Sequence, residues 1–138
     1  MTTIDRAQNR VAKFMTAGGQ LEERLESFQL PDRETFTRRS KMLTEELVEL
    51  GQAYLDGDEV AFADAYGDLL YVLLGGVEEA GFDIEPVFNV IADANDAKID
   101  WKKGEPYVTR EDGKILKPEG WVGPESKIAE IMGVKSHG

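Results

Sequence analysis

The 138-residue sequence contains no cysteine and only one histidine, His137, which is the second-last residue. Without cysteine there are no disulfides and no thiolate zinc sites. With one histidine near a chain end, histidine acid–base catalysis and a histidine-ligated metal site are both disfavoured. We therefore expect any chemistry to use carboxylates, lysines, a bound cation and water.

Positive charge is scarce, because 16 Lys and Arg face 27 Asp and Glu, for a net charge of −11. This balance argues against sequence-independent nucleic-acid binding, which needs Lys and Arg against phosphates. A small nucleotide remains an acceptable ligand, because a bound divalent metal reverses the local field. No uninterrupted apolar run approaches the roughly 18 to 20 residues that span a bilayer, and the first residues lack secretory-signal features. We expect a cytoplasmic protein with no nucleic-acid or membrane partner.

Apolar residues recur at helical spacing in four segments, at about 4–16, 33–55, 59–80 and 83–98. A Gly- and Pro-containing stretch follows, with a predicted β-hairpin around Asp112-Gly113 and a short helix over 124–132. We predict a single all-α domain over 1–138, with a four-helix core at about 4–98 and a C-terminal flap at about 101–138. The segment 59–80 is apolar on most of its circumference. Part of it is therefore expected to pack on another subunit, in a homodimer or homotetramer.

Two groups of carboxylates lie at helical spacing in the second and third predicted helices. Glu45, Glu46 and Glu49 share one turn, and Asp64 and Asp68 are four residues apart. Acidic side chains that face inward from two helices are how all-helical proteins hold a hard cation such as Mg²⁺. The alternative is a solvated acidic edge whose glutamates pair with nearby cations, namely Arg38, Arg39 or Lys41.

The absence of Lys and Arg between residues 42 and 97 favours the metal over that alternative. Asp68 lies in a strongly apolar segment, where clustered carboxylates without a cation would repel one another and take up protons. Lys98 is the first cation after this gap, and Asn95 precedes it by three residues. We expect this pair to contact phosphate oxygens or complete a metal shell. In the alternative, Lys98 only complements the C-terminus of its helix.

The run Glu45-Glu46-Leu47-Val48-Glu49, followed by Gly67-Asp68-Leu69-Leu70, resembles the EExxE…ExxD signature of the all-α nucleoside triphosphate pyrophosphohydrolases. That superfamily includes MazG-like proteins, phosphoribosyl-ATP pyrophosphohydrolases and dimeric dUTPases. Residues 87–98 and 110–118 are similar to the first two branches, and the resemblance covers roughly residues 32–124. One position departs from the pattern: the glutamate of ExxD falls at Ala65, and Asp64 is the expected substitute.

The resemblance implies an all-α fold, dependence on Mg²⁺ or Mn²⁺, and hydrolysis of a nucleoside triphosphate to monophosphate and pyrophosphate. We expect metal binding by Glu46, Glu49, Asp64 and Asp68, water activation by Glu45, and substrate binding by Asn95 and Lys98. A deoxynucleotide such as dUTP, dCTP or dGTP is the expected substrate. Phosphoribosyl-ATP ranks lower because of the long flap. A non-enzymatic acidic helical module that mimics DNA is the third hypothesis.

Overall fold

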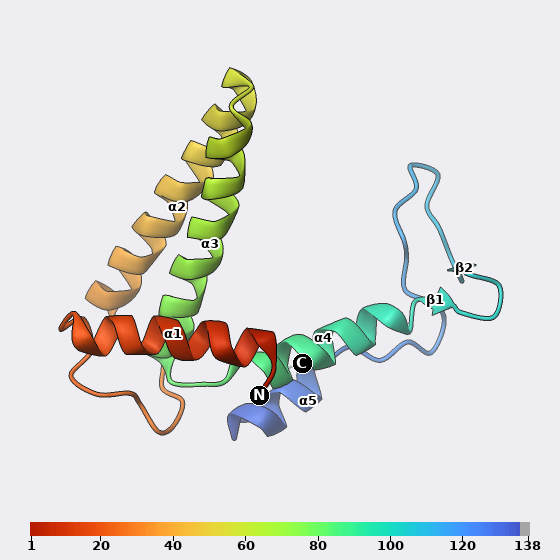
Figure 1. The fold of residues 1–138 in the computed structure, drawn as a ribbon. Coiled ribbons are helices and arrows are strands. Elements are labelled where there is room, and N and C mark those ends of the chain that lie inside the picture. Colours follow the sequence, from red (N-terminus) through yellow and green to blue (C-terminus); the bar gives the residue numbers. More distant parts are fainter. Residues whose placement is uncertain (136–138) are drawn as a thin grey trace. The chain divides into compact units, whose positions relative to one another are not determined.

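The all-α prediction is confirmed by the structure, a computed structural model that describes residues 1–135, so that His137 lies outside the described residues (Figure 1). Five helices form in this range, with one small two-stranded sheet. The elements are α1 (Thr3–Ala17), α2 (Arg33–Asp56), α3 (Glu59–Ala80), α4 (Ile84–Asp96), β1 (Ile99–Asp100), β2 (Glu105–Pro106) and α5 (Glu125–Met132). The chain divides into two compact units, Met1–Ile84 and Glu85–Gly138. The prediction of one domain with all four helices in its core stays a prediction.

Short polar residues and glycine set the ends of α2 and α3. The carboxylate of Asp32 accepts a hydrogen bond from the Thr35 amide at 2.8 Å, and Asp58 does the same for Ala61 at 3.0 Å. Between the helices, Gly57 adopts the left-handed conformation with φ of 66°, which ends α2. This short turn folds α2 and α3 into an antiparallel hairpin (Figure 1). The acidic middle of α2 thereby faces the first half of α3.

Helix α1 packs against α3 in the first unit. In Figure 1, α1 crosses the hairpin near the end where α3 finishes. Val11 and Met15 of α1 form a buried cluster with Leu74 of α3. Partly buried apolar residues from the flanking segments surround this cluster, namely Ala7, Leu21 and Ile84. This core fixes α1 beside the C-terminal half of α3.

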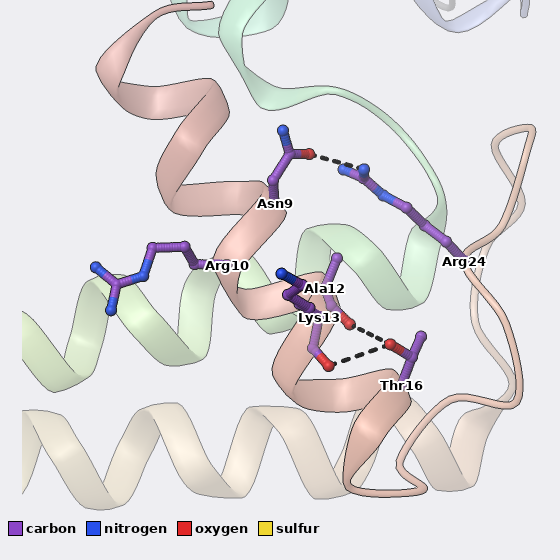
Figure 2. A pocket seen from close by; sticks show the side chains of 6 residues that line it. All are labelled: Asn9, Arg10, Ala12, Lys13, Thr16 and Arg24. Atoms are coloured by element: carbon purple, nitrogen blue, oxygen red, sulfur yellow. Dashed lines mark hydrogen bonds between the residues drawn. The ribbon is translucent and has the colours of Figure 1, made fainter.

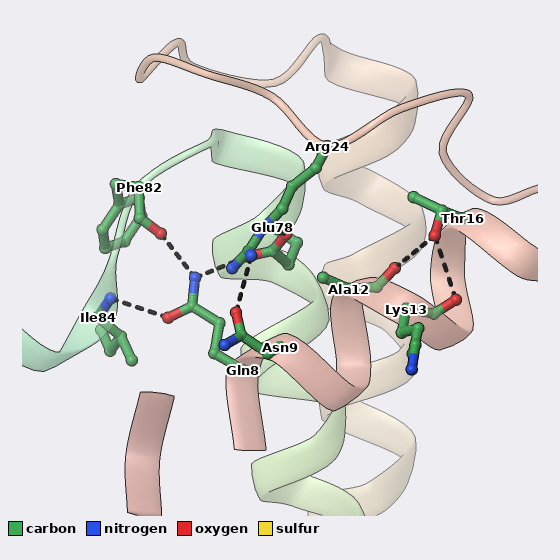
Figure 3. Close-up of polar contacts among 9 residues, drawn as sticks. All are labelled: Gln8, Asn9, Ala12, Lys13, Thr16, Arg24, Glu78, Phe82 and Ile84. Atoms are coloured by element: carbon green, nitrogen blue, oxygen red, sulfur yellow. Dashed lines mark hydrogen bonds and ion pairs between the residues drawn. The ribbon is translucent and has the colours of Figure 1, made fainter. Parts of the chain in front are cut away.

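A buried polar network reinforces the α1–α3 contact (Figure 3). The Gln8 amide donates to Glu78 Oε2 at 2.6 Å and to the Phe82 carbonyl at 2.8 Å, and its oxygen accepts from the Ile84 amide. The carboxylate of Glu78 is only 3% exposed and also accepts from Arg24 Nε at 2.8 Å. Arg24 belongs to the segment between α1 and α2. The network therefore ties this connection to both helices, with every buried charge paired.

A second ion pair joins α2 to α3. Arg39 Nε lies 2.7 Å from Glu79 Oε1, and both side chains are largely buried. The arginine passes over Gly75 so closely that a Cβ at that position would lie 2.6 Å from Nη1. A side chain at position 75 would therefore push the guanidinium away from its place beside Glu79.

Much of the apolar surface of α3 is exposed in the single chain. Tyr66 is 56% exposed, and Leu70 and Leu73 are each 50% exposed. Apolar exposure of this kind is what packing of α3 on a second subunit requires, and that packing stays a prediction. By length and mean hydropathy α3 would also suffice to cross a membrane, although acidic residues interrupt its apolar run. Core helices of soluble proteins pass the same test, so this is weak evidence.

The second unit holds α4, the small sheet and α5. β1 pairs antiparallel with β2, a pairing that the sequence did not indicate. The hairpin predicted at Asp112-Gly113 forms without regular strands. The Arg110 amide donates to the Lys114 carbonyl at 2.8 Å, and a bridge joins Thr109 to Ile115, with Gly113 at φ of 90°. Residues Glu125–Met132 form the short final helix, as predicted.

Candidate metal centre

The α2–α3 hairpin brings three carboxylates together. Glu46 and Glu49 of α2 and Asp68 of α3 each offer an oxygen, and these oxygens all lie within 4.8 Å of one another. We refer to these three residues as the carboxylate cluster. Glu46 and Asp68 are half-buried, whereas Glu49 is exposed. The cluster therefore opens to solvent on one side and meets the helix interface on the other.

The surroundings of the carboxylate cluster disfavour the ionised form of Glu46 and Asp68. Partial burial is the main cause that raises the pKa of Glu46, followed by a hydrogen bond to Glu49 and the charges of Glu49, Asp68 and Asp64. Burial also raises the pKa of Asp68, followed by the charge of Asp64 and a hydrogen bond with it. Burial and like charges both favour the protonated form. A divalent cation would reverse both effects.

Two arginines that precede the Lys- and Arg-free stretch 42–97 form ion pairs at the C-terminal end of α3 and not with the carboxylate cluster. Arg24 pairs with Glu78 and Arg39 with Glu79. Among residues 1–135, no Lys or Arg forms an ion pair with Glu46, Glu49 or Asp68. The alternative that Arg39 neutralises an acidic edge of α2 is therefore wrong, because Arg39 binds Glu79 instead.

The residues present fit a hard divalent cation. All three donors are carboxylate oxygens, which is the ligand type that Mg²⁺ and Mn²⁺ prefer. Glu46 Oε2 is buried and has no hydrogen-bond partner in the described part of the chain. A buried carboxylate oxygen without a donor is costly, and a cation would satisfy it.

Asp64 lies beside the cluster rather than within the set of mutually close oxygens. It is one helical turn before Asp68, with which it shares a hydrogen bond, and its charge also acts on Glu46. Ala65 occupies the position expected for the family glutamate and is 2% exposed, so it lies in the packed interior. Asp64 is thus close enough for its charge to raise the pKa values of Glu46 and Asp68. Its role as a metal ligand stays a prediction.

Glu45, the predicted catalytic residue, is exposed and lies outside the three-carboxylate set. Because one residue corresponds to about 100° of helical rotation, the side chain of Glu45 leaves α2 about 100° away from that of Glu46. It lines an open hollow of about 450 Å³ with five other α2 residues, namely Phe36, Thr37, Ser40, Lys41 and Thr44. Its role therefore stays a prediction.

Asn95 and Lys98 belong to the second unit, where they contact each other. Lys98 Nζ donates to Asn95 Oδ1 at 3.0 Å and lies 5.1 Å from the centre of the Trp121 ring. Trp121 also donates from Nε1 to the Ala94 carbonyl at 2.7 Å. Lys98 therefore contacts Asn95 and Trp121 within its own unit. Substrate binding by Asn95 and Lys98 stays a prediction.

Comparison with known proteins agrees with this geometry. The sequence model of a family described as phosphoribosyl-ATP pyrophosphohydrolase matches residues 19–95, which is more than half of the chain and includes all of α2 and α3. The chain belongs to this family. A search of curated proteins found no match.

Membership in the phosphoribosyl-ATP pyrophosphohydrolase family makes the chain a hydrolase of phosphoanhydride bonds, within the MazG-like all-α superfamily. Enzymes of this family use a divalent metal, and the carboxylate cluster lies inside the matched region. The non-enzymatic acidic module is therefore disfavoured. A pyrophosphohydrolase of the MazG-like type is the conclusion that the family supports.

Proposed function

We propose that the protein hydrolyses a nucleoside triphosphate, and specifically a deoxynucleotide such as dUTP, dCTP or dGTP, to the monophosphate and pyrophosphate with Mg²⁺ or Mn²⁺. The observation that carries this proposal is the cluster of three carboxylate oxygens within 4.8 Å, with a buried Glu46 oxygen that lacks a donor. Family membership supplies the reaction class, since these enzymes cleave a phosphoanhydride next to a nucleoside.

In this proposal Glu46, Glu49 and Asp68 hold the cation, and Asp64 supports Asp68 from the preceding turn. When bound, the divalent ion would neutralise the triphosphate oxygens and make water a better nucleophile. Glu45 takes the proton from the attacking water, because it is an exposed carboxylate next to the cluster. The water oxygen bonds to the α-phosphorus, the bond to the bridging oxygen breaks, and pyrophosphate leaves. Asn95 and Lys98 are proposed to contact the departing phosphates.

The test is a pyrophosphate-release assay over a panel of nucleoside and deoxynucleoside triphosphates. Glu49→Ala and Asp68→Ala should each abolish release while the helical circular dichroism stays unchanged. If both variants still release pyrophosphate, the carboxylate cluster is not the metal centre.

Phosphoribosyl-ATP is the second candidate substrate, and the family description favours it directly. The same metal chemistry would serve it, with a different nucleoside end. Assaying phosphoribosyl-ATP beside the triphosphate panel separates the two, because the true substrate should have the highest kcat/KM. We rank it second because residues 101–138 add a long segment after α4.

A further inference from the structure

A hollow of about 260 Å³ lies between α1 and α3 in the first unit. Two small apolar side chains and Arg10 line it from α1, and Gly67, Leu70, Tyr71 and Leu74 line it from α3. The lining is thus mostly apolar, with one aromatic ring and one guanidinium. A mainly apolar and aromatic lining with a few polar groups is the usual composition of small-molecule sites.

The hollow and the carboxylate cluster are neighbours along α3, because Gly67, which lines the hollow, directly precedes Asp68. Asp64, Asp68 and Tyr71 follow each other on α3 at spacings of four and three, which places them along one side of the helix. Tyr71 lies about 4.5 Å farther along the helix axis than Asp68, at about 1.5 Å per residue. The base of a nucleotide whose phosphates bind at the cluster can therefore reach the hollow, because only the sugar separates the base from the phosphates.

Tyr71 offers a ring surface to such a base. It is 43% exposed, and Phe14 of α1 packs against it edge to face, with ring centres 5.8 Å apart and an angle of 77°. The contact with Phe14 supports the tyrosine ring from one side. An aromatic ring beside a small hollow is suited to stacking on a nucleobase.

Arg10 supplies the polar contact. Its side chain extends away from Asn9 and Arg24, which are bonded to each other (Figure 2). Among residues 1–135, no carboxylate forms an ion pair with Arg10. A guanidinium has donors and no acceptor, so it favours a base edge that presents carbonyl oxygens.

We propose that this hollow binds the base of the nucleotide substrate, with Tyr71 against its face and Arg10 on a carbonyl oxygen. This assignment rests on the proposed function. The carboxylate cluster acts on the phosphates and does not distinguish one base from another, so a separate site for the base is needed. The contact with Arg10 predicts a preference for keto bases. The pair dITP and dATP tests this closely, because they differ only in an oxo and an amino group at position 6 and the accompanying ring proton.

Gly67 provides a steric test that leaves Tyr71 and Arg10 in place. A Cβ at Gly67 would meet no heavy atom within 4 Å, so Gly67→Leu should fold and fill the hollow. Gly51→Leu in α2 is the matched control, because its Cβ also meets nothing and Gly51 does not line this hollow. Gly67→Leu should raise KM for the best triphosphate at least about tenfold, as expected when a built contact is lost. Equal KM values in both variants would overturn the proposal.

Arg10→Met keeps a flexible, unbranched apolar stem but removes the guanidinium and its donors. The wild type should hydrolyse dITP with a kcat/KM about tenfold or more above that for dATP, and Arg10→Met should bring the ratio close to one. A ratio that Arg10→Met leaves unchanged, or a wild type that prefers dATP, would overturn the assigned role of Arg10.

Calorimetric titration with dIMP and dAMP tests the hollow without turnover. Tighter binding of dIMP to the wild type, lost in Gly67→Leu and kept in Gly51→Leu, supports the base site even if no triphosphate is hydrolysed. That result would count against the proposed function alone. Conversely, pyrophosphate release with equal dIMP binding by both glycine variants would keep the proposed function and overturn the base site.

Discussion

Replacement of Asp68 by asparagine is expected to change stability in opposite directions with and without a divalent metal. The substitution keeps the size of the side chain and its place in α3. It removes a negative charge that lies within 4.8 Å of two other carboxylates, Glu46 and Glu49. Without metal, the loss of repulsion should raise Tm. With metal, the loss of a ligand should remove the stabilisation that binding provides.

Both magnitudes can be estimated. Two unit charges at this separation repel by about 0.9 kcal/mol at the dielectric constant of water, so the two pairs that Asp68 forms with Glu46 and Glu49 amount to about 1.7 kcal/mol. For a chain of this size that corresponds to a rise in Tm of about 6 °C. Metal at about one hundred times its Kd stabilises the wild type by about 2.7 kcal/mol, or roughly 9 °C. Asp68→Asn should lose most of this gain.

The assay is thermal unfolding of the wild type and the variant, each in chelator and in excess MgCl₂. Glu26→Gln is the control, because it removes the same charge from an exposed carboxylate between α1 and α2. The control should respond to Mg²⁺ as the wild type does. An Asp68→Asn protein that is less stable than the wild type in chelator, or equally stabilised by Mg²⁺, would refute the reasoning.

Three further results are expected. Arg24→Ala should lower the free energy of unfolding in urea by about 3 kcal/mol, because it leaves the buried carboxylate of Glu78 without its cation; a loss below about 1 kcal/mol would contradict this. Gly75→Ala should cost about 1–3 kcal/mol, since its Cβ displaces the Arg39 guanidinium, and unchanged stability would show that the arginine moves freely. In chelator, stability should fall as pH rises from about 4.5, because the raised pKa values of Glu46 and Asp68 mean that the folded cluster holds protons that the unfolded chain releases. Subtracting the profile of Asp68→Asn isolates this effect, and a difference that is flat with pH would oppose it.

The positions of the helices could be predicted from the sequence because local chemistry sets their ends. Asp32 and Asp58 start α2 and α3, and Gly57 ends α2, all through contacts within a few residues. The antiparallel hairpin then follows from the short turn. Its consequence, carboxylates of two helices within reach of one another, also follows from helical spacing.

Contacts between distant segments could not be predicted in the same way. Nothing local indicates that Arg39 pairs with Glu79 or that Arg24 pairs with Glu78, because these pairs depend on how whole helices pack. Which side of α3 is covered within one chain also depends on that packing. An apolar circumference predicts burial, but α1 and α2 cover only part of this helix in one chain. The hollow beside Tyr71 depends on the α1–α3 packing for the same reason.

The measurement that tests the central claim most directly is product analysis of nucleotide hydrolysis with Mg²⁺. Pyrophosphate and nucleoside monophosphate should appear in equal amounts from at least one substrate of the panel, phosphoribosyl-ATP included. Release should disappear in chelator and in Asp68→Asn, whereas Glu26→Gln should retain it. Orthophosphate as the first product, or undiminished pyrophosphate release by Asp68→Asn, would contradict the assignment of the carboxylate cluster as the metal centre of a pyrophosphohydrolase.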